Sequence, residues 1–131
     1  MTHKNMTIMV IEDEELLLNA ITKKLEVSGI KPMAYLDADT ALAYLMDESN
    51  IPPHAIWLDY HLKGTDGLEF TKKVKESPRL KSIPIVVVSN SANDETVKNV
   101  LSLGIDKYLL KAEHRLDDII KVIESILETN K

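Results

Sequence analysis

The feature that most constrains this chain is a series of short apolar runs, each of which stops at a polar residue. Four such pairs are Thr7–Ile11 before Glu12 and Asp13, Ala55–Leu58 before Asp59, Ile83–Val88 before Ser89, and Tyr108–Leu110 before Lys111. The third run is β-branched without alternation, as expected for a strand covered on both faces. If the runs are parallel strands of one sheet, their carboxyl ends share the edge where open α/β sheets bind ligands.

Segments with helical periodicity separate these runs. Helices are predicted from about Glu14 to Val27, from Asp37 or Asp39 to about Met46, around Leu68–Val74, from Asn93 or Asp94 to Gly104, and from about Leu116 to Leu127. Another short strand is predicted at Lys31–Leu36, where Pro32 suits the start of an edge strand. Strands that alternate with helices call for parallel pairing through right-handed crossovers.

The helical stripes also predict which side chains face the core. In the first helix the expected core residues are Leu17, Ile21 and Leu25; in the second they are Ala38, Ala41, Leu42 and Leu45; in the fourth they are Val97, Val100 and Leu101; and in the last they are Leu116, Ile119, Ile120, Ile123, Ile126 and Leu127. Each stripe leaves a polar face for solvent. The pattern therefore predicts a sheet that is covered by helices.

Length and composition are those of one ordinary globular domain. The chain has 131 residues, of which 44% are hydrophobic and 28% are charged, and we expect a single domain over residues 1–131 with its core at about 6–128. No stretch approaches the ~18 apolar residues of a membrane span, and Cys is absent, so we expect a cytoplasmic protein without membrane insertion. A net charge of −5 argues against direct nucleic-acid binding.

The acidic residues at the predicted strand ends favour a metal site. Glu12, Asp13 and Asp59 would bring carboxylates close together, which is costly unless a cation neutralises them or some of them take up protons. A hard divalent ion with oxygen ligands and remaining water is typical of Mg²⁺. Lys111 would add a second positive charge from the other side.

Five motifs follow one another in a characteristic order. They are Val10-Ile11-Glu12-Asp13-Glu14, Trp57-Leu58-Asp59, Asp66-Gly67, Ser89 at a strand end, and Tyr108-Leu109-Leu110-Lys111. With these motifs the chain resembles the CheY-like receiver domain of two-component response regulators from about Thr7 to Leu127. The resemblance implies a doubly wound α/β fold, in which a five-stranded parallel sheet of flavodoxin-like order 2-1-3-4-5 carries helices on both faces.

The resemblance also implies a phosphoacceptor chemistry. Asp59 would take a phosphoryl group from a phosphohistidine of a histidine kinase or a histidine phosphotransfer protein. Asp13 and Asp59 would bind Mg²⁺, Glu12 would do so directly or through water, and the backbone carbonyl of His61 would complete the ligands from the protein. Such a domain assists its own phosphorylation and dephosphorylation but is not expected to turn over an external substrate.

The same resemblance implies a switch. Lys111 would pair with Asp59 before transfer and with the phosphoryl oxygens afterwards, Ser89 would hydrogen-bond a phosphoryl oxygen, and Tyr108 would turn into the vacated space. His61 and Ser91 would influence how long the phosphoryl group lasts. A downstream effector protein would then read the face formed by the fourth helix, the last strand and the last helix.

Some residues depart from the family pattern, and other functions compete with this interpretation. Ala112 stands where the family usually has a proline after a cis bond, so either a strained non-proline cis bond persists or the loop takes another path. A docking module of the same fold could act without phosphorylation. A haloacid-dehalogenase-type phosphatase would require a second Asp where His61 stands, and a flavodoxin-like cofactor binder would require a Gly/Ser/Thr-rich loop where residues 12–15 are acidic.

Overall fold

A computed structural model describes residues 5–62, 65–90 and 93–129 of the chain. Its sheet is parallel and has the order β2-β1-β3-β4-β5, which confirms the predicted doubly wound class. The strands in chain order are β1 at Thr7–Ile11, β2 at Lys31–Tyr35, β3 at Ala55–Asp59, β4 at Ile85–Ser89 and β5 at Lys107–Leu110.

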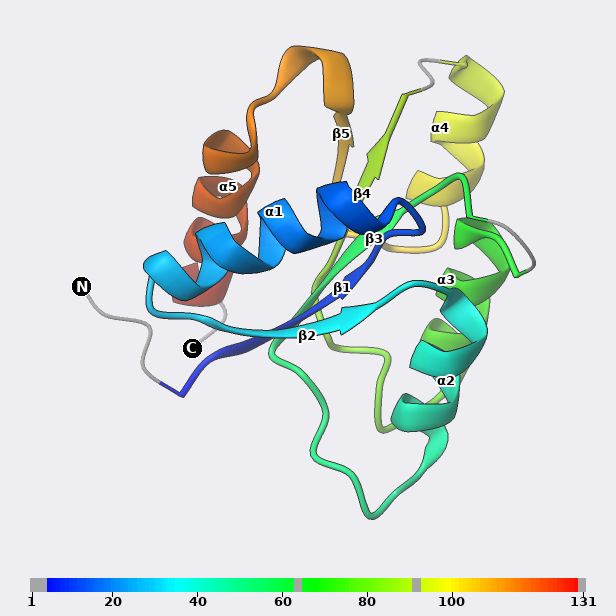
Figure 1. Cartoon of the computed structure of the whole chain (residues 1–131). Helices are drawn as coiled ribbons and strands as arrows, with labels where there is room; N and C mark the ends of the chain where they lie inside the picture. Colours follow the sequence, from blue (N-terminus) through cyan, green and yellow to red (C-terminus); the bar gives the residue numbers. More distant parts are fainter. Residues whose placement is uncertain (1–4, 63–64, 91–92, 130–131) are drawn as a thin grey trace.

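The helices cover both faces of this sheet, as Figure 1 shows. They are α1 at Glu15–Val27, α2 at Ala38–Met46, α3 at Gly67–Glu76, α4 at Asp94–Leu101 and α5 at Leu116–Thr129, with a 3₁₀ turn η1 at Lys111–Glu113. One buried cluster joins the sheet to α1 and α5, and the other joins it to α2, α3 and α4. The central strands β3 and β4 are buried along their whole length, as the β-branched run predicts.

Side-chain caps fix where several helices begin. The Asp37 carboxylate accepts a hydrogen bond from the Thr40 backbone N–H at 2.7 Å, so Asp37 rather than Asp39 is the N-cap of α2. The Asn93 side chain accepts from the N–H groups of the first turn of α4 and caps that helix. Of the two candidate starts predicted for each of these helices, the structure selects Asp37 for α2 and Asn93 for α4.

Some predicted positions are wrong by one or two residues. Strand β4 begins at Ile85 rather than Ile83, because Pro84 has no N–H to donate and the Ile83 N–H bonds to Leu80 within a turn. On α1, Leu18 is buried together with Ile21 and Leu25, and Leu17 is only partly covered. Leu101, the last residue of α4, is 48% exposed, while its neighbour Val100 is fully buried.

The chain beyond β5 resolves the question raised by Ala112. No cis peptide bond occurs within the described ranges, so the bond between Lys111 and Ala112 is trans. The chain turns at once into η1 and then enters α5 at Leu116. Of the two expected alternatives, the strained cis bond is therefore wrong, and the loop instead follows a different path through a trans bond and η1.

None of the helices within residues 5–62, 65–90 and 93–129 combines the length and the apolar character that crossing a bilayer requires.

Gly67, from the Asp66-Gly67 motif, allows the first turn of α3 to lie against the backbone just after β3. A Cβ atom at this position would lie 2.9 Å from the Tyr60 Cα, and the Gly67 N–H donates to the Tyr60 carbonyl at 3.1 Å. We predict that Gly67→Ala lowers the free energy of unfolding by about 1–3 kcal/mol, because the backbone contact would have to open.

Urea denaturation of the purified variant measures this loss, with Glu69→Ala, at an exposed position of the same first turn of α3, as the control. Without the contact, Ala in a helix would raise the free energy of unfolding by about 0.4–1 kcal/mol. A gain in stability for Gly67→Ala would therefore contradict the packing described.

Candidate functional site

The carboxyl ends of the parallel strands bring the predicted polar residues to one edge of the sheet. Asp59 ends β3 and Ser89 ends β4, while Glu12 and Lys111 directly follow β1 and β5. The register places Ile11 beside Leu58, Asp59 beside Val88, and Ser89 beside Leu110, so the strand ends lie at similar levels. Residues separated by up to 99 positions in sequence thus become neighbours.

Three carboxylates form a tight group at this edge. One oxygen from each of Glu12, Asp13 and Asp59 lies within 4.8 Å of the other two. Glu12 and Asp59 are buried, and Asp13 is partly exposed toward solvent. Opposite ligand oxygens around Mg²⁺ lie about 4.2 Å apart, since each sits at about 2.1 Å from the ion. The group therefore gathers three carboxylate oxygens of the kind that a small hard cation binds.

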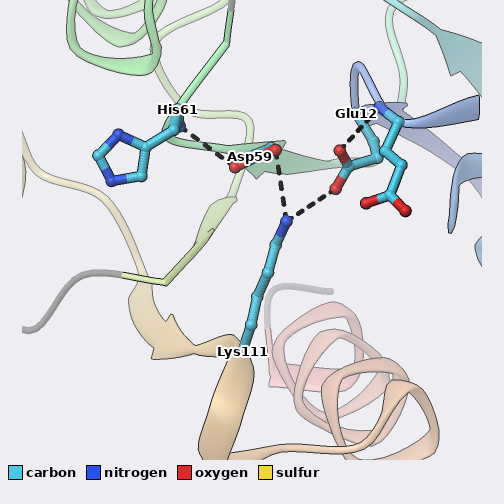
Figure 2. A network of polar contacts seen from close by, with 5 residues as sticks. Glu12, Asp59, His61 and Lys111 are labelled. Atoms are coloured by element: carbon cyan, nitrogen blue, oxygen red, sulfur yellow. Dashed lines mark hydrogen bonds and ion pairs between the residues drawn. The ribbon is translucent and has the colours of Figure 1, made fainter.

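Lys111 lies between two of these carboxylates, as Figure 2 shows. Its Nζ is 3.0 Å from Glu12 Oε1 and 3.4 Å from Asp59 Oδ2. Burial alone would lower the pKa of Lys111, but the hydrogen bond with Glu12 and the charges of both carboxylates outweigh it and raise the pKa above its usual value. Lys111 therefore stays charged at neutral pH.

The surroundings of Asp59 disfavour its ionised form. Burial and the negative charge of Glu12 raise the pKa of Asp59 to about 7, although Lys111 and the His61 N–H act in the opposite direction. When all groups are ionised, the three carboxylates and one ammonium carry a formal charge of −2. A divalent cation would balance that charge, and its absence favours a proton on Asp59.

Backbone groups hold the two buried carboxylates in place. The Glu14 N–H donates to Glu12 Oε2 at 3.1 Å, and the His61 N–H donates to Asp59 Oδ1 at 3.2 Å. Figure 2 shows the His61 ring directed away from Asp59, so His61 contacts the site through its backbone. The sequence pattern did not indicate the part played by Glu14, because a backbone contact leaves no residue-type signal.

Two of the remaining predicted site residues, Ser89 and Tyr108, lie on the neighbouring strands β4 and β5. Ser89 is fully buried at the end of β4, and Tyr108 is partly buried in β5, where it packs against the core on the side of α2, α3 and α4. Tyr108 is also close enough to Tyr60 to contribute to the raised pKa of Tyr60, after burial and the charge of Asp66. Ser91 lies outside the described residues.

Comparison with known proteins places this geometry in a family. The family model of the response regulator receiver domain matches residues 8–124. Response regulator Rcp1 of Synechocystis is 31% identical over 125 residues, which cover 91% of this chain and 84% of Rcp1. The phosphate regulon regulator PhoB of Escherichia coli is 32% identical over 105 residues, and the match spans 79% of this chain but only 44% of PhoB.

Solved structures agree with these relatives. The receiver domain of the Francisella response regulator 1452 superposes with a TM-score of 0.84 at 22% identity, covering 97% of this chain and 100% of that domain, which supports the fold. The Mn²⁺-bound form of Rcp1 has a TM-score of 0.79 at 29% identity and covers 92% of this chain and 91% of its own. Sequence motifs, sheet order and carboxylate cluster lead to the same assignment: the chain belongs to the response regulator receiver domain family.

Proposed function

We propose that this chain is a phosphoacceptor receiver of a two-component signalling system and that Asp59 takes the phosphoryl group. The observation that carries the proposal is the position of the Asp59 carboxylate, which ends β3 within reach of the Lys111 ammonium and beside the other two carboxylates. Family membership supports the same assignment. The phosphoryl donor would be a histidine kinase or a histidine phosphotransfer protein.

The carboxylate cluster supports a Mg²⁺ site in this proposal. Asp13 and Asp59 would bind the ion, Glu12 would bind directly or through water, and the His61 carbonyl would complete the protein ligands. Mg²⁺ supplies neutralisation of the charge that develops on the transferring phosphoryl group. That Rcp1 has been solved in a Mn²⁺-bound form is consistent with a divalent ion at this edge.

The transfer itself needs little from the protein beyond position and charge. An oxygen of the Asp59 carboxylate forms a bond to phosphorus while the bond from phosphorus to the donor imidazole nitrogen breaks, and the electron pair of that bond returns to the imidazole. Lys111 is held by Glu12 and pairs with the Asp59 carboxylate before transfer. After transfer its ammonium would pair with a phosphoryl oxygen. Because the acceptor of the phosphoryl group is a residue of the chain itself, the reaction would not be the turnover of an external acceptor substrate.

Phosphorylation would be read through a change of shape. The buried Ser89 hydroxyl would gain a strong acceptor in the phosphoryl group, and the loop that follows Ser89 would be drawn inward. Tyr108 would then move into the space that this loop vacates. The face formed by α4, β5 and α5 would then contact an effector protein in the cytoplasm. His61 and Ser91 would set the lifetime of the phosphoryl group, and residues 1–131 would act as one receiver unit.

The first test is phosphorylation of the full chain by acetyl phosphate with Mg²⁺. We predict that the wild type gains the mass of one phosphoryl group, that Asp59→Asn gains none because the amide is not a nucleophile, and that the exposed Asp117→Asn control is labelled like the wild type. Intact-mass spectrometry provides the readout. Labelling of Asp59→Asn would exclude Asp59 as the acceptor, and an unlabelled wild type would favour a phosphorylation-independent docking module.

The raised pKa of Asp59 predicts how metal binding depends on pH. Below a pKa of about 7 Asp59 holds a proton that Mg²⁺ must displace, so the affinity should rise about tenfold from about pH 6 to about pH 8. Isothermal titration calorimetry of the wild type measures the change. Asp59→Asn should bind Mg²⁺ with little dependence on pH over this range, and a flat wild-type profile would argue against a proton on Asp59.

Lys111 provides a separate test of the switch. Lys111 is partly exposed, so we expect Lys111→Ala to remain folded while losing the response to phosphorylation, since nothing then links Glu12 to the new phosphoryl oxygens. Beryllofluoride with Mg²⁺ serves as the phosphoryl mimic, and amide chemical shifts at Ser89 and Tyr108 report the response. The exposed Lys107→Ala in β5 is the control. A normal response of Lys111→Ala would remove the lysine from the switch.

A further inference from the structure

A pocket of about 360 Å³ lies between α1, α5 and the sheet, beside the carboxylate cluster. On this side of the sheet α1 and α5 run next to each other, and η1 leads from β5 into α5 above them (Figure 1). The lining residues contributed by α1 and α5 are Leu17, Ile21, Leu116 and Ile119. Glu12 and Lys111 of the carboxylate cluster also line the pocket, whereas Asp13 and Asp59 do not, so the pocket borders the proposed phosphorylation site without containing Asp59.

The interior of this pocket is mostly apolar. Trp57 in β3 and Val88 in β4 form its floor, and both are almost completely shielded from solvent by packing in the core. Ile21 and Ile119 are equally buried in their helices, whereas Leu17 and Leu116 are partly exposed. The pocket is thus built on packed strands and helices and would bury the apolar body of a ligand.

Two residues that lead into α5 stand at the mouth of the pocket, and one of them, Arg115, is a cation. His114 and Arg115, between η1 and α5, contribute to its lining. The Arg115 backbone N–H donates to Asp118 Oδ2 at 3.2 Å, but within residues 5–62, 65–90 and 93–129 its guanidinium has no hydrogen-bond or ion-pair partner.

Two of the acidic groups near the pocket each have a lysine partner. Glu12 is paired with Lys111, and Asp117 is paired with Lys24 at 3.0 Å. Lys111 also lines the pocket, but its Nζ is engaged by Glu12 and Asp59, so among the described lining residues the Arg115 guanidinium is the cation left for an anion that enters.

We propose that this pocket binds a small apolar carboxylate, with its hydrocarbon body against Trp57, Leu17 and Ile119 and its carboxylate on Arg115. The volume lies in the lower part of the range for small-molecule sites, about 300–1,000 Å³, which suits one fused aromatic ring system or a short branched chain. A guanidinium can hold a carboxylate through two parallel hydrogen bonds. The site is additional to the proposed phosphoacceptor function and can be tested without phosphorylation.

The test compares two probes of nearly equal shape, 2-naphthoate and its neutral analogue 2-naphthamide, titrated into the full chain. Amide chemical shifts should change saturably at Leu17, Ile119 and Leu116 for both probes. Because an ion pair with an exposed guanidinium contributes at most about 1 kcal/mol, naphthoate should bind up to about fivefold more tightly than naphthamide. Absence of saturable binding of either probe, or shift changes confined to another face, would overturn the proposal.

Two variants separate the apolar and the charged contributions. Arg115→Gln should reduce the affinity for naphthoate to that for naphthamide, whereas Lys98→Gln, an exposed cation of α4, should leave both affinities unchanged. Leu17→Phe should fill part of the pocket and weaken both probes at least fivefold.

Thermal unfolding and retained Mg²⁺ binding show that each variant is folded. If Arg115→Gln leaves the preference for naphthoate intact, the assigned anion contact is wrong. If Leu17→Phe is folded and binds as well as the wild type, the assigned pocket is wrong.

Discussion

The central constraint in this molecule is the charge imbalance at the carboxyl edge of the sheet. Two buried carboxylates and a third nearby one share a single ammonium, Lys111, at 3.0 Å from Glu12 and 3.4 Å from Asp59. Like charges held this close raise the proton affinity of Asp59, whose pKa rises to about 7. The same imbalance makes the edge receptive to a divalent cation and gives Asp59 and Lys111 their proposed tasks.

The fold maintains this arrangement because the carboxyl ends of the strands are held by pairing within the sheet and by helices packed on both of its faces. Parallel pairing in register aligns the ends of β1, β3, β4 and β5, and two layers of helices bury β1, β3 and β4 up to those ends. Backbone N–H groups of Glu14 and His61 hold the carboxylates, and Gly67 allows α3 to approach Tyr60 closely. The packing of the core therefore also sets the geometry of the site.

The sequence predicted the elements well, because each strand is a short apolar run bounded by polar or turn residues. The convergence of Asp13, Asp59 and Lys111 also followed from parallel pairing, while the order 2-1-3-4-5 came from the family resemblance. The predictions were wrong where tertiary packing determines which side chains of a helix are buried. Periodicity alone did not distinguish Leu17 from Leu18, and it placed Leu101 inward although α4 ends there and leaves it exposed.

Other features left no signal that sequence patterns could reveal. The path of the chain after Lys111 depends on a trans bond to Ala112 and on η1, and the pocket beside α5 depends on how α1 and α5 pack. Backbone hydrogen bonds to Glu12 and Asp59 are likewise independent of residue type at Glu14 and His61. These features arise from the relative placement of elements, which a one-dimensional pattern does not contain.

The most direct measurement of the central claim is anomalous diffraction from crystals of this protein soaked in Mn²⁺. The account predicts one strong anomalous peak within bonding distance of carboxylate oxygens of Asp13 and Asp59, with Lys111 Nζ on the opposite side of the Asp59 carboxylate. A peak elsewhere on the molecule, or no peak together with Asp13, Asp59 and Lys111 far apart, would contradict it.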